Sequence, residues 1–156
     1  MKHFLILFSL LYVFQGFSQE YGEAQSKLNW LTDLNEAKQV SAKTKKPIII
    51  YFTGSDWCGP CKMLKADFFN SEKFEKISSD LVLLKIDIPR RKDIVTAEQL
   101  TKNKKVVKQY NKGGSYPNLV ALNSKGKVLG SLNGYTFLRE TDRHFAFVTS
   151  VIEKYY

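Results

Sequence analysis

Two mainly apolar runs stand out in the middle of the chain, at residues 48–52 and 81–88. The first run reads Ile-Ile-Ile-Tyr-Phe, and the second contains only one lysine and one aspartate. The first run does not alternate between apolar and polar residues, as a strand with one solvated face would, and the second run is a further candidate for a buried strand. Both runs therefore predict strands that are covered on both faces of a sheet.

Apolar positions at helical spacing lie on either side of these runs. Asp33 and Glu36 have the spacing of a capping box and predict a helix that ends near residues 43–46. Further helices are predicted from Cys58 to a break at 70–71, over 72–77, over 97–110 and over about 138–155.

The end of the chain carries a hairpin pattern, because apolar residues at 118–122 and 127–132 flank Asn-Ser-Lys-Gly at 123–126. A short first strand is predicted at 28–31. Strands separated by helices favour parallel pairing, whereas a closing hairpin adds antiparallel strands. The sequence thus predicts an α/β fold with a central mixed β-sheet and flanking helices.

The first eighteen residues differ from the rest of the chain. Lys2 and His3 precede an apolar run at 4–14, and the small residues Gly16 and Ser18 come before polar sequence. The run is shorter than a membrane span. We therefore expect a signal peptide at 1–18, a domain at 19–156, and a periplasmic or secreted protein. The alternative is an uncleaved membrane anchor, with the domain facing outside the cytoplasm.

Composition and charge narrow the choice of partners. A chain of 156 residues with 44% hydrophobic residues is the size of one globular domain. Its net charge of +9 is spread over the chain, with basic clusters at 43–46, 90–92 and 102–105. No basic stripe with interleaved aromatic residues is present, so a nucleic-acid partner is not expected. The alternatives to a solvated basic surface are an acidic partner protein and an anionic membrane surface.

The two cysteines, Cys58 and Cys61, are three positions apart at a predicted helix start. A bridge that closes so short a loop restricts the unfolded chain little, so redox chemistry explains the pair better than stability does. Free backbone N–H groups at a helix N-terminus stabilise a thiolate. Cys58, the more exposed, would attack a substrate disulfide, and Cys61 would resolve the mixed disulfide. Gly59 permits the tight turn, and Pro60 stiffens it.

A metal site at the cysteines is not expected. A structural zinc site needs four ligands, and the only histidines are His3, inside the predicted signal peptide, and His144. His144 is predicted on the surface of the last helix. We expect neither a metal nor another cofactor. A purely structural bridge remains the other alternative.

The segment Trp-Cys-Gly-Pro-Cys-Lys at 57–62 resembles the active-site motif of the thioredoxin family in full. Residues 47–50, 85–87 and 116–117 are similar to three further family segments at the expected spacing. The resemblance covers roughly residues 28–156 and implies a thioredoxin-like fold. The Gly-Ser-Asp before Trp57 is similar to the secreted members of the family.

The resemblance also implies roles for residues around the cysteines. Pro117 would follow a cis peptide bond and lie against the dithiol, which would leave the Tyr116 backbone free to pair with an extended substrate strand. Trp57 would cover the redox site. Lys85 would lie behind it and influence thiolate formation.

Tyr51 departs from the family pattern. Thioredoxins carry a buried aspartate at this position, which is thought to handle the proton of the second cysteine. A phenol with an ordinary pKa near 10 is a poor base at neutral pH. The proton of Cys61 would then pass to water, to Lys85 or to another group, with Asp56 as a candidate.

The predicted function is an exported thiol–disulfide oxidoreductase that reduces or isomerises disulfides in envelope proteins. The Gly59-Pro60 spacer matches the reducing members of the family. Expected partners are proteins with disulfides or thiols and a membrane protein that donates electrons; a monomer suffices. The alternative function is a binding module with a regulatory or idle dithiol.

Overall fold

The computed structural model describes residues 28–156, so the predicted signal peptide at 1–18 lies outside the described residues. The strands are β1 (Trp30–Leu31), β2 (Ile48–Thr53), β3 (Val82–Asp87), β4 (Asn118–Leu122) and β5 (Val128–Asn133). The helices are α1 (Leu34–Thr44), α2 (Gly59–Leu64), α3 (Glu72–Ser78), α4 (Ala97–Tyr110) and α5 (Asp142–Tyr155), with a π-helix, η1 (Lys65–Phe69), directly after α2.

The five strands form one sheet in the order β1-β3-β2-β4-β5. Strand β3 pairs in parallel with β1 and β2, whereas β4 is antiparallel to β2 and to β5. The predicted α/β architecture, a mixed sheet with flanking helices, is confirmed.

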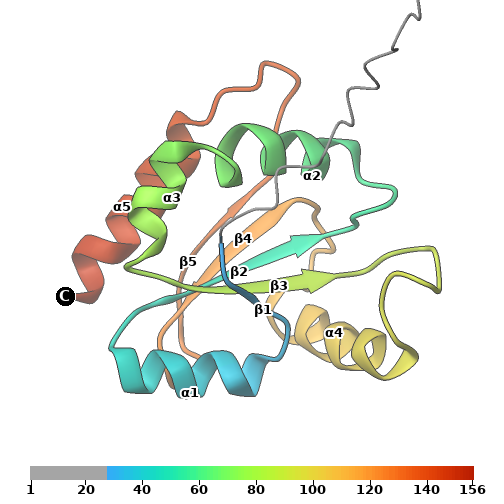
Figure 1. Cartoon of the computed structure of the whole chain (residues 1–156), viewed down its shortest axis with the longest axis horizontal. Helices are drawn as coiled ribbons and strands as arrows, with labels where there is room; N and C mark the ends of the chain where they lie inside the picture. The colour runs from blue at the N-terminus through green and yellow to red at the C-terminus, as the bar shows by residue number, and fades with distance from the viewer. Residues whose placement is uncertain (1–27) are drawn as a thin grey trace, which may run out of the picture.

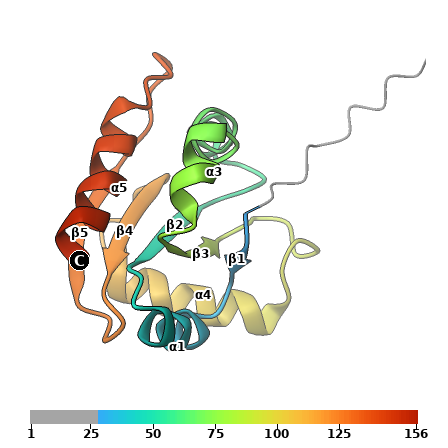
Figure 2. The same ribbon diagram turned by 60° about the vertical axis from the view of Figure 1, so that its left-hand side comes forward.

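Helices cover both faces of the sheet (Figure 1). Helices α1 and α4 lie on one face, and α2, α3 and α5 lie on the other, as the turned view in Figure 2 shows. Successive side chains of a strand point to opposite faces. Ile48, Ile50 and Phe52 of β2 therefore join the core under α1 and α4, while Ile49 and Tyr51 join the core under α2, α3 and α5.

Side-chain caps fix where three helices begin. The Asp33 carboxylate accepts hydrogen bonds from the first turn of α1, and the Ser71 and Thr96 hydroxyls do the same for α3 and α4. Such caps satisfy N–H groups that have no partner within the helix. Lys45, in a left-handed conformation, ends α1.

The prediction for the last helix was wrong at its start. Helix α5 begins at Asp142 rather than near residue 138, because residues 136–139 form a separate turn closed by the Arg139 N–H donating to the Thr136 carbonyl. The helix from Cys58 also changes character: from Lys65 onward it is a π-helix, in which the Asn70 N–H donates to the Lys65 carbonyl at 2.9 Å.

The predicted surface position of His144 was also wrong. Its side chain is only 1% exposed and lies between the rings of Phe68 and Tyr135, at centroid distances of 5.6 and 5.4 Å. Burial lowers the pKa of His144 to about 4, and the nearby charge of Arg143 acts in the same direction. The neutral ring packs here as an aromatic side chain. Its spacing from Val148 and Val151 on α5 was the available sequence signal.

Candidate functional site: the Cys58–Cys61 redox centre

Cys58 and Cys61 form a disulfide at the beginning of α2, with their Cα atoms 5.2 Å apart. Cys58 is the N-cap of the helix, and its Sγ accepts a hydrogen bond from the Cys61 N–H at 3.2 Å. Pro60 lies in the first turn, where a helix needs no N–H donor. Both cysteines are buried, at 4% exposure for Cys58 and 1% for Cys61, so the predicted difference between them is small.

Trp57 covers the redox turn, and three contacts fix its indole. The indole Nε1 donates to the Ile88 carbonyl at 2.8 Å, the Tyr116 ring packs edge-on at 5.4 Å, and the Arg90 guanidinium lies 5.0 Å from the ring centroid. A Cβ atom at Gly54 would lie 2.2 Å from the indole. Gly54 is therefore needed for this indole position, a requirement that the sequence analysis missed.

Asp56 ties the redox loop to the segment after β3. Its carboxylate accepts hydrogen bonds from the backbone N–H groups of Arg90 and Arg91 at 2.9 to 3.1 Å. The sequence offered Asp56 as a candidate acceptor for the Cys61 proton. Its hydrogen bonds indicate a structural role instead.

The Tyr116–Pro117 peptide bond is cis, as the resemblance implies. Tyr116 is half-buried against Trp57, and Pro117 is buried. The Pro117 carbonyl accepts a hydrogen bond from the Gly134 N–H at 2.8 Å, which connects this segment to the loop between β5 and α5. Tyr116 and Trp57 thus lie side by side, and Pro117 is buried next to Tyr116 in the chain.

Tyr51 lies behind the disulfide, buried in β2. Its hydroxyl donates a hydrogen bond to the Cys61 carbonyl at 2.9 Å. Burial raises the pKa of Tyr51 well above its usual value, and the negative charge of Asp87 raises it further. The phenol therefore remains protonated and holds the first turn of α2 in place. The sequence showed that Tyr51 is a poor base but not that it is a donor to Cys61.

A cavity of about 560 Å³ opens beside Cys61 on the face of the sheet that carries Tyr51. Lys85 pairs with Tyr51 in the strand register and lines this cavity, half-buried, together with Lys62 and Lys65. Cys61 lines this cavity, whereas Trp57 and Tyr116 do not. Lys85 is thus on the side of Cys61 that the resemblance implies.

Among the described residues, no group of three or more His, Cys, Asp or Glu side chains is placed to hold a metal ion. Within residues 28–156, no helix combines the length and the apolar character that a membrane span requires.

Comparisons with known proteins agree with this site. A family model described as thioredoxin-like matches residues 29–124. The disulfide bond reductase DsbH of Chlamydia pneumoniae is 33% identical over 110 residues, which cover 70% of this chain and 64% of that protein. A solved structure of a DsbH oxidoreductase superposes with a TM-score of 0.68 and 28% identity, covering 81% of this chain and 85% of that one.

A chicken (Gallus gallus) thioredoxin is 37% identical over 60 residues, which cover 37% of this chain and 51% of that protein. The chain therefore spans less than two thirds of the length of these curated relatives. The family match covers more than half of the chain and includes the two cysteines and the cis-proline segment. The chain belongs to the thioredoxin-like family.

Proposed function

We propose that the protein is a thiol–disulfide oxidoreductase that reduces disulfides in other proteins. The observation that carries this proposal is the position of the disulfide: Cys58 caps α2, and Cys61 lies one turn further in. In the reduced protein, the N–H groups at the start of α2 would stabilise the Cys58 thiolate. The similarity to a protein named as a disulfide bond reductase supports the same activity.

The reaction is two thiol–disulfide exchanges. The Cys58 thiolate attacks one sulfur of the substrate disulfide, which forms a mixed disulfide and releases the first substrate sulfur as a thiolate. Cys61 loses its proton and attacks the Cys58 sulfur, which restores the Cys58–Cys61 bond and releases the second substrate sulfur. Two electrons pass from the dithiol to the substrate, and the two released substrate thiolates take up the two protons that Cys58 and Cys61 give to the solvent.

The proton of Cys61 leaves through the cavity beside it. Tyr51 cannot accept this proton, because its hydroxyl is protonated and donates to the Cys61 carbonyl. Water in the cavity is the acceptor, and the ammonium of Lys85 favours the Cys61 thiolate by its charge.

The Gly59-Pro60 spacer supports reduction rather than oxidation. The midpoint potential is expected nearer to that of thioredoxin, about −270 mV, than to that of a strong oxidant, about −120 mV. Equilibration of the protein with glutathione buffers measures it. A midpoint above about −180 mV would assign the protein to the oxidants or isomerases.

The predicted signal peptide at 1–18 supports an exported protein, periplasmic or secreted. A reductant in an oxidising compartment must be reduced again after each turnover. A membrane protein that donates two electrons by thiol–disulfide exchange is the partner that this requires. The substrates of the exported oxidoreductase are envelope proteins with accessible disulfides.

Insulin reduction, followed by turbidity with dithiothreitol as electron donor, tests the activity. The wild-type protein is expected to accelerate precipitation, and Cys58→Ser to return the rate to that of dithiothreitol alone. A wild-type rate no faster than dithiothreitol alone would contradict the proposal and favour a binding module with an idle dithiol.

Cys61→Ser tests the assignment of the two sulfurs. This variant keeps the attacking thiolate but cannot release the substrate, so mixed disulfides should accumulate at Cys58. Mass spectrometry of complexes isolated from the envelope would identify the partners. The double variant Cys58→Ser/Cys61→Ser is the matched control and should capture none; equal capture by Cys58→Ser alone would reverse the assignment.

A further inference from the structure

The loop between β5 and α5 presents two large apolar side chains to solvent. Phe137 is 85% exposed and Leu138 is 76% exposed. They occupy the two central positions of the turn Thr136–Arg139, which the Arg139 N–H closes by donating to the Thr136 carbonyl at 3.1 Å. Such positions usually carry Gly, Pro, Asn, Asp or Ser. Turn formation does not explain two adjacent exposed apolar residues here.

Contacts on both sides fix this turn to the helix that follows the cysteines. Tyr135, which precedes the turn, is buried, and its hydroxyl donates to the Asp67 carboxylate at 2.7 Å. The guanidinium of Arg139, its last residue, donates through Nε to the same carboxylate at 2.8 Å. Hydrogen bonds from Arg139 and then Tyr135 hold the pKa of Asp67 below its usual range. These hydrogen bonds fix the position of the turn relative to η1.

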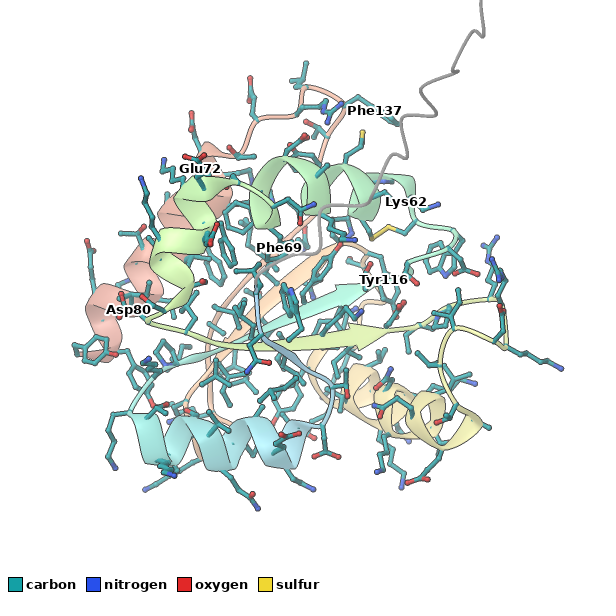
Figure 3. All side chains as sticks on the ribbon, viewed as in Figure 1. Lys62, Phe69, Glu72, Asp80, Tyr116 and Phe137 are labelled. Atoms are coloured by element: carbon teal, nitrogen blue, oxygen red, sulfur yellow. A yellow bond between two sulfur atoms is a disulfide. The ribbon has the colours of Figure 1, made fainter. Side chains whose placement is uncertain are left out.

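The turn also adjoins the redox surface. Gly134, three residues before Phe137, donates its N–H to the carbonyl of Pro117, which neighbours Tyr116 and Trp57. Figure 3 shows Phe137 projecting from the same side of the sheet as Lys62 on α2, away from the body of the protein. A chain that lies across Trp57 and Tyr116 would reach the turn within a few residues.

We propose that the turn Thr136–Arg139 is a docking element for protein substrates, in which Phe137 and Leu138 bind an apolar segment next to the disulfide under attack. This inference rests on the proposed reductase function. The partner is an oxidised protein that exposes apolar residues beside its disulfide, as an incompletely folded chain does. Apolar anchors at the edge of a reactive surface give affinity without altering the chemistry of the sulfurs.

The charges around the turn favour a protein over an anionic membrane surface. The Asp67 carboxylate offsets the charge of Arg139, whereas Arg143, which donates to the neutral Asn133 carbonyl, keeps its positive charge. Glu140 and Asp142 add negative charge next to the apolar tip. Segments that bind anionic lipid place lysines and arginines beside their apolar residues.

A comparison of large and small substrates tests the proposal. Phe137→Ser/Leu138→Ser is expected to lower kcat/KM for insulin about tenfold, mainly through KM. Its kcat/KM for bis(2-hydroxyethyl) disulfide should stay within about twofold of wild type. The matched control is Val128→Ser/Leu129→Ser, which removes two exposed apolar side chains at the other end of β5 and should leave both substrates unaffected. Unchanged insulin kinetics, or equal losses for both substrates, would overturn the proposal.

A binding measurement separates this inference from the reductase function. Reduced and carboxymethylated α-lactalbumin has exposed apolar segments but no disulfide. Its affinity for Cys58→Ser/Cys61→Ser protein should fall about tenfold when Phe137 and Leu138 are also replaced. If the wild-type protein reduced neither insulin nor bis(2-hydroxyethyl) disulfide but this loss of affinity were observed, only the reductase function would be contradicted. Equal affinity of the two proteins for α-lactalbumin would overturn the docking role. A second result would overturn it too: no binding of α-lactalbumin, together with flotation on phosphatidylcholine and phosphatidylglycerol vesicles that depends on Phe137. That result would assign the turn to a membrane.

Discussion

The two faces of the sheet are built from the same strands but from different kinds of side chain. The buried strand residues of the face under α1 and α4 are aliphatic except for Phe52. They are Ile48, Ile50, Val82, Leu84, Ile86, Val120 and Leu122, and Tyr110 and Tyr116 pack against this core as partly buried residues. The face under α2, α3 and α5 is rich in aromatic rings, namely Trp30, Tyr51, Phe68, Phe69, Phe74 and Phe145, and it carries the disulfide and the cavity.

This difference separates stability from chemistry within one sheet. Aliphatic side chains pack without directional contacts, so the α1 and α4 face mainly provides apolar burial. Its buried polar residues, Ser41 and Asn103, donate hydrogen bonds to the backbone carbonyls of Lys46 and Asp87. The opposite face must place a phenol, an amine and two sulfurs at defined positions. Its rings meet at angles, as Phe69 and Phe74 do at 88°, and the Tyr51 hydroxyl needs a partner in the interior. The redox face therefore gives up some packing to hold polar groups and a water-accessible cavity.

Leu84→Ala is the largest perturbation that this comparison predicts. Leu84 is fully buried on the aliphatic face, so its truncation should lower the free energy of unfolding by about 2–5 kcal/mol. The midpoint potential of Cys58 and Cys61 should not change, since the residue points away from them. Denaturant unfolding and a glutathione titration measure the two quantities. A shifted potential would show that the faces are coupled and break the comparison.

Acid should destabilise the protein through His144 on the redox face. The pKa of His144 in the folded protein is about 4, below its ordinary value of 6.5, so between these values the unfolded chain binds a proton that the folded chain does not. The stabilisation from the neutral ring is complete above pH 6.5 and is lost as the pH falls toward 4. Taken at order of magnitude from this pKa difference, the loss is about 2–3 kcal/mol.

His144→Phe keeps a ring in this position but removes the titrating group. Its free energy of unfolding should fall about 2–3 kcal/mol less than that of wild type between pH 6.5 and pH 4. The same slope in both proteins would mean that carboxylates, and not His144, account for the acid sensitivity.

Tyr51→Phe and Lys85→Met give the smallest changes in stability and separate two functions of the redox face. Loss of the Tyr51 hydroxyl removes one of the hydrogen bonds that the Cys61 carbonyl accepts, while the bond from the Lys65 N–H remains, and should cost about 1 kcal/mol. The pH profile of single-turnover reduction should stay in place for Tyr51→Phe, because the phenol accepts no proton. Lys85→Met should move the profile to higher pH, because it removes a positive charge near the Cys61 sulfur. A moved profile for Tyr51→Phe would restore the phenol as a participant in proton transfer.

Much of the fold could be predicted from local patterns. Helix α4 begins and ends where its apolar periodicity predicted, β2 extends one residue beyond its apolar run, and β3 lies within its run. These patterns are local, because a cap or an apolar period lies within one element. The start of α5 was mispredicted because residues 136–139 are also compatible with a helix, and their turn is fixed by contacts between Arg139 and Asp67, far away in the sequence.

The part of the site that could be predicted from the sequence is the part whose reactive residues lie in one contiguous segment. The motif around Cys58 and Cys61 is contiguous, so it could be found without a structure. The hydrogen bond from Tyr51 to the Cys61 carbonyl and the burial of His144 depend on how strands and helices come together. Apolar periodicity does not encode which hydroxyl meets which carbonyl, and a histidine on a helix is usually not fully buried.

The π-helix Lys65–Phe69 contains one more residue per turn than an α-helix would allow. The extra residue lets the adjacent rings of Phe68 and Phe69 both enter the core while Asp67 faces Tyr135 and Arg139. An alignment with a relative whose helix is regular here should therefore need a one-residue gap within this segment. Deleting one residue would rotate the preceding turn by about 100° relative to the core and separate the carboxylate of Asp67 from both its partners. We therefore expect the extra residue of η1 to occur in relatives that also have the turn Thr136–Arg139, because Asp67 of η1 anchors this turn.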